Sequence, residues 1–254
     1  MAGHSKWANI KRQKARVDAV KGKTFTQLSR AIIVAARSGV PDPAGNFQLR
    51  TAIEKAKAAR IPSENIERAI AKGAGKLGGD SSMEAVRYEG YGAAGVAIII
   101  EALTDNRNRT AADLRMAFTK KSGNLGETGC VSWMFEHKGV VAIASPVDEE
   151  QLLEASLEGG ADFYELIEDE DGESAFVFTE VGNLEALSHH LKDKGFTVSD
   201  VELRWVPSNT VEVTDLDQAR SLLKLIDSLE ALDDVQNVTA NFEMADQLMA
   251  LSIV

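Results

Sequence analysis

The sequence predicts an α+β protein: an N-terminal helical bundle with a basic arm, then two ferredoxin-like α/β domains, one inserted in the other. Two changes along the chain support this prediction. Apolar residues recur at helical spacing up to about residue 76, and from about residue 84 they alternate or form short β-rich runs. Lysine and arginine gather in the first 80 residues, and acidic residues gather after them.

The charge is divided more sharply than its sum suggests. The chain has 254 residues, 44% of them hydrophobic, which is the composition of a globular protein with enough length for a buried core. The net charge is −11, but residues 1–80 contain 16 lysines and arginines against 6 acidic residues, and residues 81–254 contain 12 against 33. This asymmetry indicates that the basic end meets a polyanion, which repels the acidic remainder.

The first 23 residues are interpreted as an extended basic arm, because seven basic residues accompany a single acidic one. Such cations can neutralise phosphates with release of counterions, and an indole offers a face on which an exposed base can stack. Nothing in the spacing is suited to base edges, so sequence specificity is not implied. A solvated tail without a role is the alternative. The candidate nucleic-acid contacts in the arm are Lys6, Trp7, Lys11, Arg12, Lys14, Arg16, Lys21 and Lys23.

Three helices are expected between residues 24 and 76. The first ends near Gly39, and the second ends at Ile61-Pro62, because a residue before proline leaves the α region. Ser63 is the expected N-cap of the third helix. Two cations on one stripe of the second helix are further candidate nucleic-acid contacts, with a solvated helix surface as the alternative: Arg50 and Lys57.

Residues 137–206 show the element order βαββαβ, which is the split ferredoxin-like pattern. The expected strands are 140–144, 162–167, 175–178 and 197–205, and the expected helices are 149–157 and 184–191. The chain on either side supplies another set of elements. Its expected strands are 85–89, 95–103, 131–135, 210–213 and 235–242, and its expected helices are 110–121 and 216–232.

Taken without the first strand, the flanking elements make a second βαββαβ unit, interrupted between its middle strands. Insertion there is physically plausible, because the ends of a compact domain lie close together. The expected domains are therefore 1–80 for the arm and helical bundle, 81–136 with 207–254 for the interrupted ferredoxin-like domain, and 137–206 for the inserted one.

Arg107 and Arg109 stand just before the helix that a Thr110/Asp113 capping box predicts. The helix macrodipole disfavours cations at this end. Their position is explained if an anion is bound there by free N–H groups and guanidinium groups, so both are candidate anion contacts. The alternative is that both arginines pair with carboxylates of the acidic domains.

No pattern for catalysis, a metal or a cofactor emerges. Residues 90–95 match GxGxxG, but a strand follows instead of a helix, so a hairpin turn is the better interpretation. The acidic segment 165–173 does not fit a calcium loop, and the four histidines lack metal-ligand spacing. With one cysteine, Cys130, neither a disulfide nor a cysteine zinc site is expected within the chain.

The predicted location is the cytoplasm, without membrane contact. One cysteine fits a reducing compartment. The basic N-terminus has no apolar run after it, so it is not a secretory signal, and an organelle transit peptide is the alternative. The longest apolar stretches are too short to span a bilayer.

Several stretches closely resemble the YebC/PmpR family. They are residues 1–10 (MAGHSKWANI), 22–25 (GKTF), 65–70 (NIERAI), 88–92 (YEGYG), 104–110 (TDNRNRT) and 123–126 (GNLG). The match covers about the first 140 residues and continues more loosely to the C-terminus. The resemblance implies a helical N-terminal domain, two α/β domains with one interrupting the other, and a cytoplasmic regulator without enzymatic activity. Members are described as DNA-binding transcriptional regulators, and relatives, including a mitochondrial translational activator, as ribosome-associated factors.

The leading hypothesis is a non-enzymatic regulator of gene expression that binds nucleic acid through its N-terminal region, of the DNA-binding YebC/PmpR type. DNA and ribosomal RNA remain alternative targets, with the ribosome or the transcription machinery as the corresponding partner. A translation factor associated with ribosomal RNA is the first alternative function. The second is a sensor that holds a small anionic molecule through Arg107 and Arg109.

Overall fold

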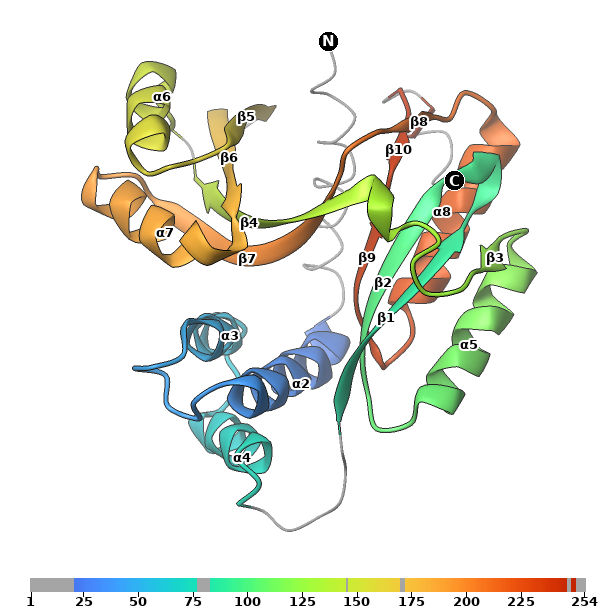
Figure 1. Ribbon diagram of the computed structural model, residues 1–254, viewed down its shortest axis with the longest axis horizontal. Helices are drawn as coiled ribbons and strands as arrows, with labels where there is room; N and C mark the ends of the chain where they lie inside the picture. The colour runs from blue at the N-terminus through green and yellow to red at the C-terminus, as the bar shows by residue number, and fades with distance from the viewer. Residues whose placement is uncertain (1–20, 77–82, 145, 170–171, 246–247, 250–254) are drawn as a thin grey trace. The chain divides into compact units, whose positions relative to one another are not determined.

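The computed structural model describes residues 21–76, 83–144, 146–169, 172–245 and 248–249 (Figure 1). The chain divides into two compact units. Unit 1 comprises Met1–Met134 and Pro207–Val254, and unit 2 comprises Phe135–Val206, against the 137–206 expected for the inserted domain. The predicted α+β class is confirmed, since helices come first and sheets follow.

Three helices open the described part of unit 1: α2 (Lys21–Ser38), α3 (Phe47–Ala58) and α4 (Ser63–Gly73). They confirm the three predicted helices. Their apolar faces form one small core, which consists of Ile32, Ile33, Ala35, Ala36, Leu49, Ile53, Ala56, Ile61, Ile66 and Ala69. The arm prediction is wrong at its end, because residues 21–23 are helical: the helix continues ahead of its first apolar residue, Phe25.

The expected capping role of Ser63 is also wrong. Pro62 occupies the N-cap of α4, Ser63 is the first helical residue, and no side chain caps this end. Instead the carbonyl of Pro62 accepts the N–H groups of Asn65 and Ile66. A capping side chain is found at α3, where Asn46 Oδ1 accepts the N–H of Leu49 at 3.0 Å.

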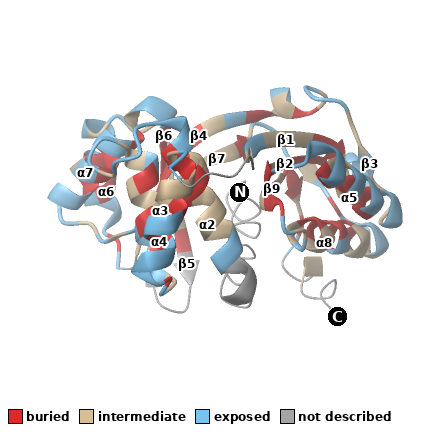
Figure 2. Ribbon diagram, turned by 90° about the horizontal axis from the view of Figure 1, so that it is seen from below, coloured by how far each residue is buried: buried red, intermediate tan, exposed pale blue. Residues whose placement is uncertain are grey.

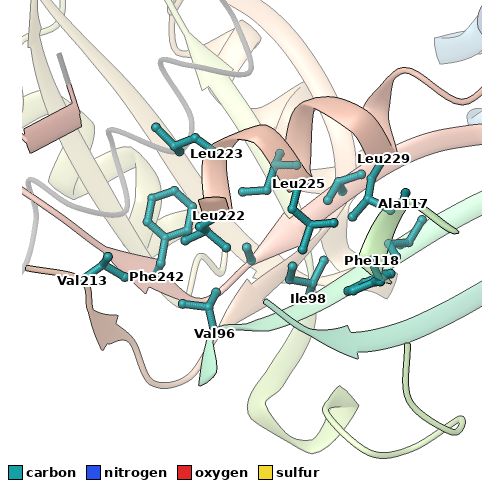
Figure 3. Packing of buried hydrophobic residues seen from close by; sticks show 14 of the residues in the cluster. Val96, Ile98, Ala117, Phe118, Val213, Leu222, Leu223, Leu225, Leu229 and Phe242 are labelled. Carbon is teal, nitrogen blue, oxygen red and sulfur yellow. The ribbon is translucent and has the colours of Figure 1, made fainter. Parts of the chain in front are cut away.

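The rest of unit 1 is built on a four-stranded antiparallel sheet in the order β3-β1-β2-β9. Its strands are β1 (Glu84–Tyr91), β2 (Ala97–Thr104), β3 (Asn124–Leu125) and β9 (Val235–Ala240). Two helices, α5 (Arg107–Lys120) and α8 (Leu216–Glu230), pack on one face of it. Figure 3 shows this core, where Ile98 of β2 meets Phe118 of α5 and Leu225 of α8. Two short strands, β8 (Val211–Glu212) and β10 (Phe242–Glu243), pair in parallel.

The predicted strand 131–135 is wrong. Ser132–Met134 form a short 3-10 helix, and β4 (Phe135–Ile143) then runs through the boundary expected at residue 136. The buried carboxylate of Glu89 explains the difference, because its Oε2 accepts the N–H groups of Val131 and Ser132, each at 2.9 Å. Those N–H groups are therefore not available to a strand ladder. The predicted strand order is also wrong here: β1, which the predicted βαββαβ unit omits, lies beside β2, and β8 pairs with β10 outside this sheet.

Unit 2 has the predicted βαββαβ order. Its elements are β4 (Phe135–Ile143), α6 (Glu149–Glu158), β5 (Phe163–Asp169), β6 (Gly172–Glu180), a 3-10 turn (Val181–Asn183), α7 (Leu184–Asp193) and β7 (Val198–Pro207). The strand order β5-β6-β4-β7 is that of a ferredoxin-like sheet. Buried residues concentrate on the sheet and on the inner sides of the helices, and exposed ones on the outer sides (Figure 2).

Candidate nucleic-acid interface

Most of the predicted arm lies outside the described residues. This applies to Lys6, Trp7, Lys11, Arg12, Lys14 and Arg16. Lys21 and Lys23 belong to the first turns of α2, where only the backbone is described. The structure therefore bears on the nucleic-acid hypothesis through the helical region, defined here as residues 21–76.

Arg50 and Lys57 lie seven residues apart on α3 and so on one stripe, as predicted, but their surroundings differ. Its Nη1 donates a hydrogen bond to the carbonyl of Pro43 at 2.8 Å, and its guanidinium lies 5.5 Å from the ring centroid of Phe47. Arg50 is thus half-buried against the turn that leads into α3, whereas Lys57, in the last turn of α3, is exposed. Of the two candidates, Lys57 is the one that faces solvent.

The helical region contains eleven basic and four acidic residues, so basic residues outnumber acidic ones within it. Arg68 pairs with Glu64 at 2.8 Å, and Arg37 donates to the carbonyl of Met83 at 2.6 Å. Four cations at the ends of α3 and α4 make no side-chain hydrogen bond or ion pair within the described ranges: Lys57, Arg60, Lys72 and Lys76. The helix macrodipole favours cations near a helix C-terminus, and this preference is the structural explanation for their positions.

Sequence reasoning did not select Arg60 as a candidate. It lies two residues beyond the end of α3 and has a left-handed backbone with φ of +61°. The sequence predicts a helix stop at Ile61-Pro62, and no local pattern separates a left-handed arginine at position 60 from an ordinary one.

Arg107 and Arg109 lie inside α5, not before it. Asn106 is the N-cap, and its Oδ1 accepts the N–H of Arg109 at 3.1 Å. The capping box predicted at Thr110 is therefore wrong, because Thr110 is a buried residue one turn into the helix. Its hydroxyl lies 2.7 Å from Asp234 Oδ2, so it serves a tertiary contact instead of the helix end.

Both arginines are paired with carboxylates. Arg107 Nη2 lies 2.5 Å from Glu84 Oε2. Arg109 Nη2 lies 2.9 Å from Asp105 Oδ1 and 2.8 Å from Asp234 Oδ2. Carboxylates of the protein thus occupy the positions at which an anion was expected.

The buried residue Asp234 is the centre of a cluster that joins four segments of unit 1. Besides Arg109 and Thr110, its carboxylate contacts Arg30 of α2 at 2.9 Å and Thr104 at the end of β2 at 3.2 Å. Burial alone would raise the pKa of Asp234, but hydrogen bonds from Arg109 and Thr110 and the charges of Arg109 and Arg30 hold that pKa below its ordinary value. The cluster fastens the helical region to the sheet of unit 1.

The remaining motifs have structural explanations. The GxGxxG stretch contains the last two residues of β1 and most of the connection to the antiparallel strand β2, as the hairpin interpretation predicted.

Among the described residues, no three His, Cys, Asp or Glu side chains are grouped so that they could hold a metal ion. None of the helices in the described ranges has the length and apolarity that crossing a membrane requires.

The division into a helical region and the sheet units that follow it agrees with the residues matched by two domain models of one family. The model of the TACO1/YebC protein N-terminal domain matches residues 5–76, and that of the TACO1/YebC second and third domain matches residues 83–242. The chain belongs to the TACO1/YebC family, also called YebC/PmpR.

Similar proteins share nearly the whole length of this chain. A "probable transcriptional regulatory protein" of Trichormus variabilis is 76% identical over 253 residues, with 99% of each chain covered. A protein of the same description from Nostoc punctiforme is 76% identical over 254 residues, with 100% of each covered. Among solved structures, a conserved hypothetical protein of Aquifex aeolicus is 47% identical, with a TM-score of 0.82 over 91% of this chain and 94% of that one.

Proposed function

We propose that this protein is a non-enzymatic, DNA-binding transcriptional regulator that contacts the phosphate backbone through its arm and helical region. The observation that carries the proposal is the excess of cations in the helical region, of which four have no partner in the described part of the chain. Full-length relatives named as probable transcriptional regulators support the regulatory role.

Binding of this kind is electrostatic, and it is directed by the rest of the molecule. Unit 2 contains 18 acidic and 4 basic residues between Phe135 and Val206, so it is repelled by a polyanion. The acidic unit therefore limits contact to the N-terminal end. Because nothing in the spacing of the cations predicts contacts to base edges, we expect selectivity to come from the shape of the nucleic acid or from a protein partner.

The small-molecule sensor is less well supported than nucleic-acid binding. That hypothesis depends on Arg107 and Arg109 as the groups that hold an anion. Each of them pairs with at least one carboxylate of the protein. An entering anion would have to displace these carboxylates.

The proposal is tested by a salt titration of the full-length chain against duplex DNA and, separately, a folded RNA. Replacement of Lys11, Arg12, Lys14 and Arg16 by alanine should weaken binding and flatten the dependence of log K on log salt by up to about three to four units. A matched control removes four cations from the sheet part of unit 1: Arg115, Lys120, Lys121 and Lys224. Equal affinity and slope for the arm variant and the unaltered chain would refute the role of the arm, and preference for RNA would refute DNA as the target.

A further inference from the structure

The end of α3 combines a strained backbone with an exposed cation. Arg60 has φ of +61°, and its N–H donates to the carbonyl of Lys57 at 2.9 Å. The next N–H, of Ile61, donates to the carbonyl of Ala56 at 2.9 Å. This pair of bonds is a Schellman motif, whose left-handed position favours glycine because a side chain there is sterically strained.

Three other helices end with the same pair of bonds and obey that preference. At the end of α4, Gly75 and Lys76 donate to Lys72 and Ala71, and Gly75 has φ of +72°. Helices α6 and α7 repeat the pattern with Gly160 at +71° and Gly195 at +93°. Helix α5 has Ser122, a short side chain, at its left-handed position. Of these five left-handed positions, three are glycine and one is serine, and the end of α3 has a long cationic side chain, Arg60.

Apart from the general preference for cations at a helix C-terminus, nothing in the described part of the chain explains this arginine as a structural residue. The neighbouring Ile61 is buried in the core of the helical region and anchors the turn. Arg60 itself is exposed and makes no side-chain hydrogen bond or ion pair within the described ranges. The last turn of α3 already contains Lys55 and Lys57, which satisfy the preference for cations at a helix C-terminus. A strained residue whose side chain makes no polar contact within the described ranges points to an external ligand.

We propose that Arg60 and Lys57 form a phosphate-binding pair at the C-terminal end of α3, a proposal that rests on the proposed nucleic-acid function. Guanidinium groups bind phosphate oxygens through two parallel hydrogen bonds, and an ammonium adds a second charge. The left-handed turn holds Arg60 in a fixed position relative to the backbone of Lys57, to which it is hydrogen-bonded. The ligand is the phosphate backbone shared by DNA and RNA.

The test measures stability and binding together on the full-length chain. Arg60→Gly relieves the strained backbone and removes the charge, so its Tm should stay equal or rise by a few degrees. Its affinity for a DNA duplex and for an RNA stem-loop should fall roughly three- to tenfold, with a salt slope smaller by about one. Arg60→Lys retains the charge and should keep the salt slope. Arg68→Ala is the matched control, since it removes one exposed cation that is paired with Glu64.

The outcomes separate this inference from the function on which it rests. If the unaltered chain binds neither DNA nor RNA, the proposed function fails. If it binds but Arg60→Gly and Arg68→Ala lose the same affinity, the pair is not a phosphate site. A clear fall in the Tm of Arg60→Gly would also overturn the inference, because Arg60 would then serve the fold. A loss on only one polymer identifies the nucleic acid that the pair contacts.

Discussion

The helical region and unit 2 use their cations in opposite ways. Residues 21–76 contain eleven basic and four acidic residues, and Phe135–Val206 contain four and 18. In unit 2, Lys138 is buried among Glu136, Asp162 and Glu180, while Lys194 and Arg204 pair with Glu158 and Glu202. In the helical region, four exposed or half-exposed cations have no such partner in the described chain.

This difference shows why a net charge is a poor guide to function. A cation that is already neutralised by buried or neighbouring carboxylates contributes to folding, and it cannot also attract a polyanion without losing those contacts. A cation without a partner keeps its charge for a ligand. The two regions are therefore best distinguished by variants that separate stability from binding.

The largest expected effect on stability comes from Asp234, whose ionic contacts hold parts of unit 1 together. Asp234→Ala leaves Arg30 and Arg109 without their shared carboxylate, and we expect the free energy of unfolding to fall by about 3 kcal/mol. Nucleic-acid affinity at a temperature where the variant is folded should not fall. Urea unfolding and a binding titration measure the two quantities. Asp233→Ala, an exposed neighbour, is the control, and equal stability of both variants would contradict the structural role.

A smaller loss is expected for Lys138→Met in unit 2. The variant leaves three carboxylates facing one another, but Glu180 and Glu136 are largely exposed, so we expect a loss of about 2 kcal/mol. Lys192→Met removes an exposed lysine from the same unit and should be close to neutral. Neither substitution should weaken nucleic-acid binding. A fall in affinity specific to Lys138→Met would mean that unit 2 contacts the ligand.

Acidification should weaken unit 1 through Glu89 and Asp234, which are both buried. Burial raises the pKa of Glu89, but N–H groups of Val131, Gly129 and Ser132 and the charge of Arg87 outweigh it, so its pKa lies below the ordinary 4.5. The pKa of Asp234 likewise lies below the ordinary 3.8. Groups whose folded-state pKa is lowered stabilise the fold above their unfolded pKa, and this contribution is lost as pH falls through the folded value.

The free energy of unfolding should therefore be steady from neutral pH to about pH 5 and decline below about pH 4. Urea titrations between pH 7 and pH 3 measure it. Glu89→Gln and Asp234→Asn should each show a shallower decline than the unaltered chain, whatever their starting stability. Parallel curves for all three proteins would show that other carboxylates cause the decline.

The smallest effect is expected for the exposed pair between Arg68 and Glu64. Both side chains are mostly in solvent, so Arg68→Ala should change the free energy of unfolding by no more than about 0.5 kcal/mol. Its effect on nucleic-acid affinity should be less than that of Arg60→Gly. Thermal unfolding and anisotropy titration check both values. A larger binding loss at Arg68 would move the predicted contact from the end of α3 to the surface of α4.

Periodicity predicted the elements whose positions depend on burial. The three helices of the helical region and all six main elements of unit 2 follow from apolar spacing, because each places one face against a core. Two of the errors fall where a distant side chain bonds to a residue that local spacing assigns to another role. Glu89 removes residues 131–134 from a strand, and Asp234 turns Thr110 from an expected cap into a buried contact.

Only part of the candidate site could be predicted from the sequence. Charge counting and helical spacing selected the basic end and Lys57 as candidates. They could not show that Arg50 donates a hydrogen bond to Pro43 and lies over the ring of Phe47. They also could not single out Arg60, because a left-handed backbone depends on how α3 ends against its core. The pairing of Arg107 and Arg109 with carboxylates was stated as an alternative, and the structure shows that pairing.

The central claim is that the basic N-terminal end contacts nucleic acid and that the acidic unit 2 does not. A map of where nucleic acid contacts the full-length chain tests it directly. Photo-crosslinking of bound DNA or RNA, followed by mass spectrometry of the attached peptides, gives that map residue by residue. We expect crosslinks in residues 1–76, including the turn at Arg60, and none in Phe135–Val206. Crosslinks concentrated in Phe135–Val206 would contradict the separation of the two regions.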